Sequence, residues 1–285
     1  MNEIVFALIA FFGWGTGDIF GTVAARKLGG FSSTLWSYVF RVIIFAILIP
    51  FYLVDLSRLT IEMFLFNIFL GVIGIIGLVS FNEGLKGGNA ALVGTIAASY
   101  VMLVVIFSII FLKEAITQSQ IISILVIFIG LILSTLDLKQ LKKSKVILNR
   151  SILLALIAMI VWGFYFTFIK IPVKQIGWFW PNYITVALFP LIFIFAKLRK
   201  VKLHSPKYKG AFWFAFVSAL LIGIAEYSFI FGINTGLTTI VAPIAGAYPI
   251  LFVILAFLVF KDPITRQQKF GILITLIGIV LLSVF

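Results

Sequence analysis

Three charged side chains stand inside long apolar segments of this sequence: Asp18, Arg41 and Glu226. A charge within the apolar core of a membrane is costly, so it is expected to be paired or to carry out chemistry. Asp18 lies about 10 Å and Arg41 about 13 Å from the same membrane surface, at about 1.5 Å of helix rise per residue. Two interpretations follow. The two side chains neutralise each other as an ion pair, or Arg41 binds a substrate carboxylate and Asp18 is its resting partner.

Glu226 lies about fifteen residues into its apolar segment, nearer the opposite surface. No basic residue of the apolar segments lies at its depth, so we expect Glu226 to be unpaired. An unpaired carboxylate in a medium of low dielectric constant readily binds a proton, which makes Glu226 a candidate for proton coupling. The alternatives are a carboxylic acid hydrogen-bonded to a neighbour and a carboxylate in a wet vestibule.

Composition defines the elements that must position these charges. Of the 285 residues, 63% are hydrophobic and 11% are charged. A soluble domain is about 45–50% apolar and about 25% charged, so a soluble globular protein is excluded. A membrane-spanning helix needs about 20 apolar residues. The sequence therefore predicts an all-α integral membrane protein with ten spans, near residues 3–25, 32–54, 62–85, 89–112, 118–136, 151–171, 178–197, 210–232, 237–260 and 267–285.

Basic residues mark one side of this predicted membrane protein. The loops after the first, third, fifth, seventh and ninth spans hold 17 Lys and Arg residues, and the alternate loops hold 4. The positive-inside rule places the basic loops in the cytoplasm and both termini outside the cell membrane. The run Lys139–Arg150 is expected to contact anionic lipid. Because this placement explains the net charge of +13, nucleic acid is not an expected partner.

The two halves of the chain match at a constant offset of 148 residues, with 20 identities in the 59 gapless pairs between 77–135 and 225–283. This predicts a first five-helix repeat at 1–138, a basic linker at 139–150 and a second repeat at 151–285. Five spans are an odd number, so the second repeat is inverted relative to the first. Inverted repeats around a central site characterise secondary transporters. The matching pairs include Trp14-Gly15 with Trp162-Gly163, Tyr100 with Tyr248, and Lys113–Thr117 with Lys261–Thr265.

Repeated aromatic residues are the next candidates for a site. Trp14, Tyr100, Trp162 and Tyr248 are expected to line a central cavity, where their faces suit amino-acid side chains or an organic cation. Helix packing of the Trp-Gly pairs is the alternative. Further candidates are Tyr165, Tyr227, Asn182, Asn82 and Glu83. Trp178 and Trp180 are expected in an interfacial aromatic belt. Candidate hinges are Gly15, Gly163, Pro243 and Pro249.

The sequence has no cysteine, and its single histidine, His204, lies in a polar loop. A His/Cys metal site is therefore excluded, and we expect no cofactor. The charges inside the spans lack short-range acid–base spacing, so we do not expect an enzyme.

The early Trp-Gly pair of each half resembles the EamA-type branch of the drug/metabolite transporter superfamily. The runs Ala97–Tyr100 through Phe111–Glu114 and Ala245–Pro249 through Phe260–Asp262 resemble it too. The resemblance implies a fold of two five-helix halves around a central cavity. It also implies movement of small metabolites such as amino acids, amines, sugars or nucleotides. Relatives with cytoplasmic termini are common, whereas the charge count of this chain places its termini outside.

These observations predict a secondary transporter that moves a small polar or amphipathic metabolite by alternating access, with proton coupling at Glu226 as a candidate. Amino acids or related amines are favoured, because the aromatic and charged residues could hold a zwitterion from both ends. The alternative is an uncoupled facilitator, or a flippase of a lipid-linked or organic-cation substrate. Ten spans can enclose a cavity within one chain, so a monomer suffices.

Overall fold

A computed structural model describes residues 2–87, 93, 96–135, 150–260 and 264–285. Most helices carry apolar residues on all sides, which suits a surrounding of lipid. The helical conformation satisfies the backbone polar groups within the chain, as lipid requires. The helices and short 3-10 segments (η) are α1 (Asn2–Leu28), α2 (Gly30–Phe45), η1 (Ala46–Leu48), α3 (Ile49–Tyr52), η2 (Leu53–Arg58), α4 (Ile61–Gly87), α6 (Tyr100–Phe111), α7 (Gln118–Thr135), α9 (Arg150–Phe168), α10 (Lys170–Ile176), α11 (Phe179–Ala187), α12 (Phe189–Leu198), η3 (Tyr208–Gly210), α13 (Phe212–Thr235), α14 (Thr238–Gly246), α15 (Pro249–Phe260) and α16 (Arg266–Val284).

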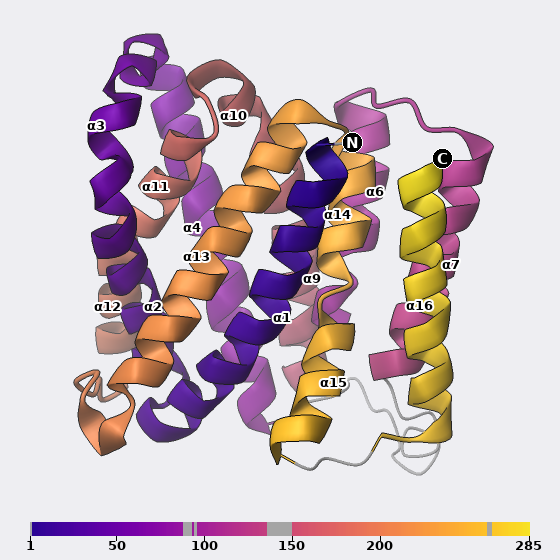
Figure 1. The fold of residues 1–285 in the computed structure, drawn as a ribbon. Helices are drawn as coiled ribbons and strands as arrows, with labels where there is room; N and C mark the ends of the chain where they lie inside the picture. The colour runs from indigo at the N-terminus through magenta and orange to yellow at the C-terminus, as the bar shows by residue number, and fades with distance from the viewer. Residues whose placement is uncertain (1, 88–92, 94–95, 136–149, 261–263) are drawn as a thin grey trace.

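The predicted all-α membrane fold is confirmed. Within the described ranges, nine helical segments are long and apolar enough to cross a membrane, and Ile96–Phe111 adds a shorter apolar helix. These ten segments coincide with the ten predicted spans. Three predicted features lie outside the described residues. They are the first part of span 89–112, the basic linker with most of Lys139–Arg150, and the motif Lys261–Pro263. Both termini lie at the same end of the helical bundle, the upper end in Figure 1.

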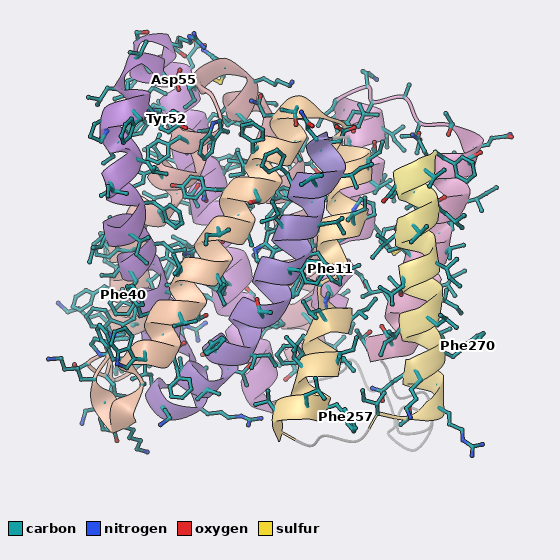
Figure 2. All side chains as sticks on the ribbon, viewed as in Figure 1. Phe11, Phe40, Tyr52, Asp55, Phe257 and Phe270 are labelled. Carbon is teal, nitrogen blue, oxygen red and sulfur yellow. The ribbon has the colours of Figure 1, made fainter. Side chains whose placement is uncertain are left out.

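Side chains on the outside of the bundle are largely apolar, which suits lipid as the surrounding solvent. Phe257 and Phe270 are 44% and 60% exposed and point away from the helices (Figure 2). Phe11, by contrast, is 5% exposed and packs between helices.

Proline divides several spans into two helices. Pro190 lies in the first turn of α12, directly after α11 ends, and Pro249 begins α15 directly after the break that follows α14. A proline lacks the N–H that would continue the preceding helix but fits a first helical turn. The ninth span is therefore discontinuous at Ala247 and Tyr248, whereas Pro243 lies within α14. Movement at these breaks stays a prediction.

Equivalent positions of the two halves make equivalent contacts. A Cβ atom built on Gly15 would lie 2.8 Å from Leu251, and one on Gly163 would lie 2.6 Å from Leu103, which is the counterpart of Leu251. Glycine is needed at both positions because the facing helix approaches so closely.

The same correspondence holds at the starts of α7 and α16. Thr117 and Gln120 exchange side-chain and backbone hydrogen bonds of 2.9 and 3.2 Å, and so do Thr265 and Gln268. Each pair is a capping box that satisfies backbone N–H groups which a helix start leaves free.

The helices α7 and α16 pack against each other through reciprocal glycines. A Cβ atom on Gly130 would lie 2.5 Å from the backbone nitrogen of Thr275, and one on Gly278 would lie 2.8 Å from that of Ile127. Thr275 and Ile127 are themselves counterparts at the offset of 148. The two helix backbones are therefore in direct contact.

Candidate functional site

An ion pair between α2 and α13 lies at the centre of the candidate site. The guanidinium Nη1 of Arg41 contacts the carboxylate Oε2 of Glu226. Arg41 is 3% exposed, and its guanidinium lies 4.4 Å over the ring centre of Tyr38. The pairing corrects two expectations, because Glu226 is not unpaired and Arg41 does not pair with Asp18.

The reach of an arginine side chain explains this correction. Both helices begin at the lower end of the bundle in Figure 1. Arg41 lies about 16 Å along α2 from its start at Gly30, and Glu226 lies about 21 Å along α13 from its start at Phe212. Helix rise locates only the backbone of each charged residue. Arg41 carries its charge several bonds away from the backbone, and its side chain spans the remaining few ångströms.

A small internal cavity, with room for about one water molecule, lies beside this pair. Its lining residues are Tyr165, Phe166, Ile169, Asn182, Glu226, Phe229 and Ile230. Asn182 is 1% exposed, and neither its amide oxygen nor its nitrogen has a hydrogen-bond partner in the described part of the chain. A buried polar group without a partner costs about 1–3 kcal/mol. An amide held at that cost beside a cavity is available to a ligand or a water molecule.

Sequence reasoning missed two residues near this site. Tyr38 lies three positions before Arg41, and this helical spacing was the signal that could have found it. Asn67 of α4 is fully buried, donates to the Pro181 carbonyl at 3.0 Å, and has no partner for its amide oxygen in the described residues. No local pattern in the sequence singles it out.

Asp18 belongs to a different cluster. Its carboxylate interacts electrostatically with the phenol groups of Tyr100 and Tyr248. Trp14, one helical turn earlier, lies 5.7 Å from Tyr248 between ring centres. Phe166 lies 5.9 Å from Trp14 and 5.0 Å from Tyr100. Phe166 is the counterpart of Asp18 in the second half, so the two equivalent positions carry different chemistry beside the same tyrosine, Tyr100.

The repeated tryptophans and tyrosines therefore gather around Phe166. Trp162 completes the set at 6.0 Å from Tyr100, and its indole nitrogen donates to the Gly74 carbonyl at 3.3 Å. None of these four side chains lines the cavity, contrary to the prediction from the sequence, whereas Tyr165 and Glu226 line it directly.

The other predicted residues are placed as follows. Tyr227 is 6% exposed, and its hydroxyl has no hydrogen-bond partner in the described residues. Glu83 is partly buried on α4, and the side chain of Asn82 lies outside the described part. Trp180 is 8% exposed and donates to the Tyr52 carbonyl at 2.7 Å, so it packs inside the bundle.

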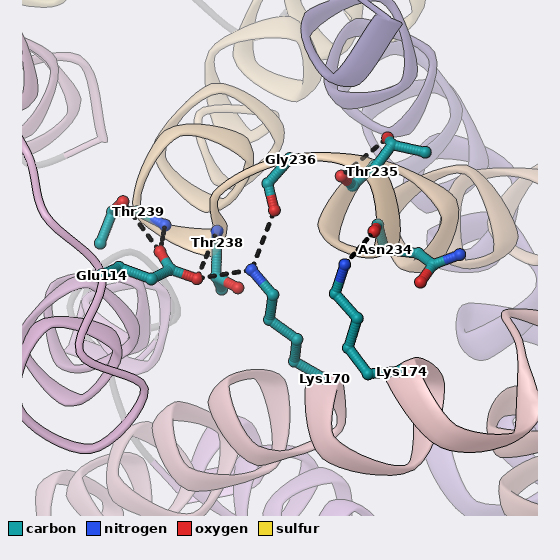
Figure 3. Close-up of polar contacts among 9 residues, drawn as sticks. Glu114, Lys170, Lys174, Asn234, Thr235, Gly236, Thr238 and Thr239 are labelled. Atoms are coloured by element: carbon teal, nitrogen blue, oxygen red, sulfur yellow. Dashed lines mark hydrogen bonds and ion pairs between the residues drawn. The ribbon is translucent and has the colours of Figure 1, made fainter.

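A second buried ion pair, between Glu114 and Lys170, is drawn in Figure 3. Glu114 Oε1 accepts from the Lys170 ammonium at 2.6 Å and from the Thr238 N–H at 3.0 Å. Its Oε2 accepts from the Thr239 N–H at 2.8 Å and from the Thr239 hydroxyl at 2.9 Å. Lys170 also donates to the Gly236 carbonyl at 2.9 Å. We call Glu114, Lys170, Thr238 and Thr239 the Glu114 junction.

The Glu114 junction joins the loop after α6, the start of α10 and the start of α14. Burial raises the pKa of the Glu114 carboxyl, but hydrogen bonds from Lys170 and from the Thr239 and Thr238 N–H groups outweigh it. Its pKa therefore lies below the ordinary value, and the group is ionised. Asp262, its counterpart in the second half, lies outside the described residues.

No group of three or more acidic or histidine side chains within the described ranges is placed to hold a metal ion.

The apolar helical segments of the described residues define a multi-pass membrane protein. The chain belongs to the EamA-like transporter family, whose model matches residues 1–136 and, a second time, residues 149–284. It is therefore a membrane transporter of the drug/metabolite type, in agreement with the resemblance found in its motifs.

Two further comparisons agree with this fold. An uncharacterised protein of Methanocaldococcus jannaschii is 27% identical over 140 residues, which cover 48% of this chain and 98% of that protein. A solved crystal structure superimposes with a TM-score of 0.80 at 17% identity, covering 99% of this chain and 97% of the other. At that identity the likeness shows the fold alone.

Proposed function

We propose that this chain is a secondary transporter of a small zwitterionic metabolite, with an amino acid or a related amine as the favoured substrate. The observation that supports this proposal is the Arg41–Glu226 ion pair. Glu226 borders a small cavity that is also lined by Asn182, whose amide has no partner in the described residues. A zwitterion can replace this pair without leaving a net charge. Its carboxylate would bind Arg41, and its ammonium group would bind the released carboxylate of Glu226.

The rest of the cavity wall suits the remainder of such a substrate. Tyr165, Phe166 and Phe229 offer aromatic surface for a side chain, and Asn182 offers one donor and one acceptor. The cavity holds about one water molecule, so a metabolite enters after helices separate. This supports alternating access, in which the ion pair closes the site when no substrate is bound.

Counterflow in proteoliposomes tests the proposal, with a radiolabelled mixture of the standard amino acids as the probe. The wild type is expected to exchange label, and Arg41→Gln and Glu226→Gln are expected to lose exchange. The matched control is Arg58→Gln, because the Arg58 side chain is 64% exposed and does not line the cavity. A thermal-shift screen gives a second readout, since a ligand present at about 100 times its Kd stabilises the folded state by about 2.7 kcal/mol.

Two outcomes would overturn this assignment. Arg41→Gln could retain full exchange and lose only stability, which would make the ion pair a structural element. The wild type could instead ignore amino acids and move a lipid-linked substrate or an organic cation, which is the flippase or facilitator alternative. Carboxylic acids without an amine and amines without a carboxylate, tested in the same assay, separate a zwitterion site from a site for either charge alone.

A further inference from the structure

Asp18 differs from the other acidic side chains buried in the bundle. Glu226 is paired with Arg41, and Glu114 with Lys170. The Asp18 carboxylate has no ion pair and no hydrogen bond among the residues that the structure describes. The side-chain hydrogen bond of Thr22 goes instead to the Asp18 backbone carbonyl, at 2.7 Å.

The long helices packed against α1 offer Asp18 no compensating charge, and the short η3, which carries Tyr208 and Lys209, contacts α1 at Lys27. The titratable groups that face it are the phenols of Tyr100 on α6 and of Tyr248 between α14 and α15. Neither α14 nor α15 contains a charged residue. From α13, the residues opposite Gly17 and Gly21 are Leu221, Ile222 and Ser218. The charged residue of α2 and that of α13 pair with each other.

The surroundings of Asp18 favour a very small cation. Four aromatic rings pack near Asp18 with centre distances of 5.0–5.9 Å, and they belong to Trp14, Tyr100, Phe166 and Tyr248. This packing leaves no space for an organic ammonium group. A proton needs no such space. Asp18 is nonetheless intermediate between buried and exposed, so it is not sealed within the packed rings.

Phe166 stands between this cluster and the substrate cavity. Its ring contacts those of Trp14 and Tyr100, and it also lines the cavity together with Glu226. A change at Asp18 can therefore reach the substrate through Tyr100 and Phe166, without direct contact between proton and substrate.

We propose that Asp18 is the proton-carrying group of this transporter and that Phe166 couples its protonation to the substrate cavity. This rests on the proposed function, and it transfers the coupling role from Glu226 to Asp18. The carboxylate gains one proton and becomes a neutral acid, with no other bond made or broken. The neutral form removes the unpaired charge that opposes movement of α1 through a medium of low dielectric constant. Release of the proton on the other side restores the carboxylate.

Proteoliposomes with an imposed pH gradient test this inference, with the radiolabelled amino-acid mixture as the probe. Asp18→Asn should lose accumulation driven by the gradient, down to the level of liposomes without protein, and should keep counterflow. Asp18→Glu should restore part of the accumulation. Glu62→Gln is the matched control, since it removes an exposed carboxylate from the same chain and should change neither reaction.

Infrared difference spectroscopy gives a readout that needs no substrate. The wild type should show a carboxyl C=O band that changes with pH, and this band should be lost in Asp18→Asn and kept in Glu226→Gln. Four results would overturn the proposal: wild-type accumulation in Asp18→Asn, loss of counterflow in a folded Asp18→Asn, counterflow without gradient-driven accumulation in the wild type, or an unchanged band in Asp18→Asn. Absence of all counterflow in the wild type would instead overturn the proposed function, and the infrared band would still test Asp18.

Discussion

Two buried ion pairs in this molecule differ in how completely their polar atoms are satisfied. In the Glu114 junction, both carboxylate oxygens accept two hydrogen bonds each and Lys170 has a second acceptor in Gly236, so the ion pair itself is fully satisfied even though the Thr238 hydroxyl has no partner in the described residues. Around Arg41 and Glu226, the amide of Asn182 and the hydroxyl of Tyr227 have no partners in the described residues. The Glu226 side chain also remains 24% exposed, whereas that of Glu114 is 5% exposed.

This difference separates a pair that holds helices together from a pair that is available for exchange. A carboxylate with four donors has nothing to gain from a ligand, because any ligand would have to replace bonds already made. A pair bordered by unpartnered polar groups loses less when a ligand enters, and the ligand can satisfy those groups. We therefore expect mutations at the first pair to act mainly on stability and mutations at the second mainly on transport.

Removal of the Glu114 carboxylate should give the largest loss of stability. Glu114→Ala leaves the Lys170 ammonium buried without its partner and frees the first N–H groups of α14. Breaking a buried pair in this way costs about 3–5 kcal/mol. Thermal unfolding in detergent measures the effect, with the exposed Glu62→Ala as control. A smaller loss than that of Glu226→Gln would contradict the comparison.

The Thr239 hydroxyl should contribute a measurable part of this stability. Thr239→Val removes the 2.9 Å hydrogen bond to the Glu114 carboxylate and keeps the shape of the side chain. A hydrogen bond to a charged group contributes about 1.5–3 kcal/mol, so the melting temperature should fall clearly. Thr235→Val is the control, because the Thr235 hydroxyl bonds to carbonyls of its own helix. Equal effects of the two variants would argue against a special role for the junction.

At the central site, replacement of the Asn182 amide should stabilise the folded protein, whereas the mutations of the Glu114 junction should destabilise it. Asn182→Leu removes a buried polar group without partners and should raise the free energy of unfolding by about 1 kcal/mol, while it impairs counterflow. Asn67→Leu is the matched control, and it should lower stability because it breaks the bond to Pro181. Destabilisation by Asn182→Leu would mean that the amide already has a partner, such as an ordered water molecule.

Acid should weaken the Glu114 junction only when the pH falls below the ordinary pKa of a glutamate carboxyl. Its pKa is lowered in the folded protein from an ordinary value of 4.5, so on acidification the unfolded chain binds this proton first. The stabilisation is therefore complete above about pH 4.5 and is lost as the pH falls through the lower, folded pKa. The difference in melting temperature between wild type and Glu114→Gln should stay constant from neutral to mildly acidic pH and shrink below that range. A difference that shrinks already near neutrality would show that the carboxylate is not held in its ionised form.

Properties that depend on local sequence were predictable. The spans followed from apolar length, and the break before Pro249 followed from its missing N–H. The capping boxes were also accessible, because Thr117 and Gln120 have the spacing that the motif requires and recur at Thr265 and Gln268.

The partner of each buried charge could not be predicted from the sequence. Arg41, Asp18 and Glu226 were recognised as the charges inside the spans, but helix depth alone does not tell which faces meet. Glu114 was part of a repeated motif, yet its partners Lys170 and Thr239 lie 56 and 125 positions away. Contacts of that kind depend on helix packing, which one sequence without its relatives does not determine.

The contact between α7 and α16 has a consequence for the origin and assembly of the molecule. In an isologous dimer, a residue i touches a residue j of the other subunit and the partner's j touches i. Gly130 with Thr275 and Gly278 with Ile127 follow this rule within a single polypeptide. The interface is thus one that two copies of an ancestral half-length chain would form, and the half-length relative from Methanocaldococcus jannaschii has the size of such a chain. The positions by which α7 and α16 recognise each other are therefore the same positions of the two halves, so one set of residues serves both sides of this contact.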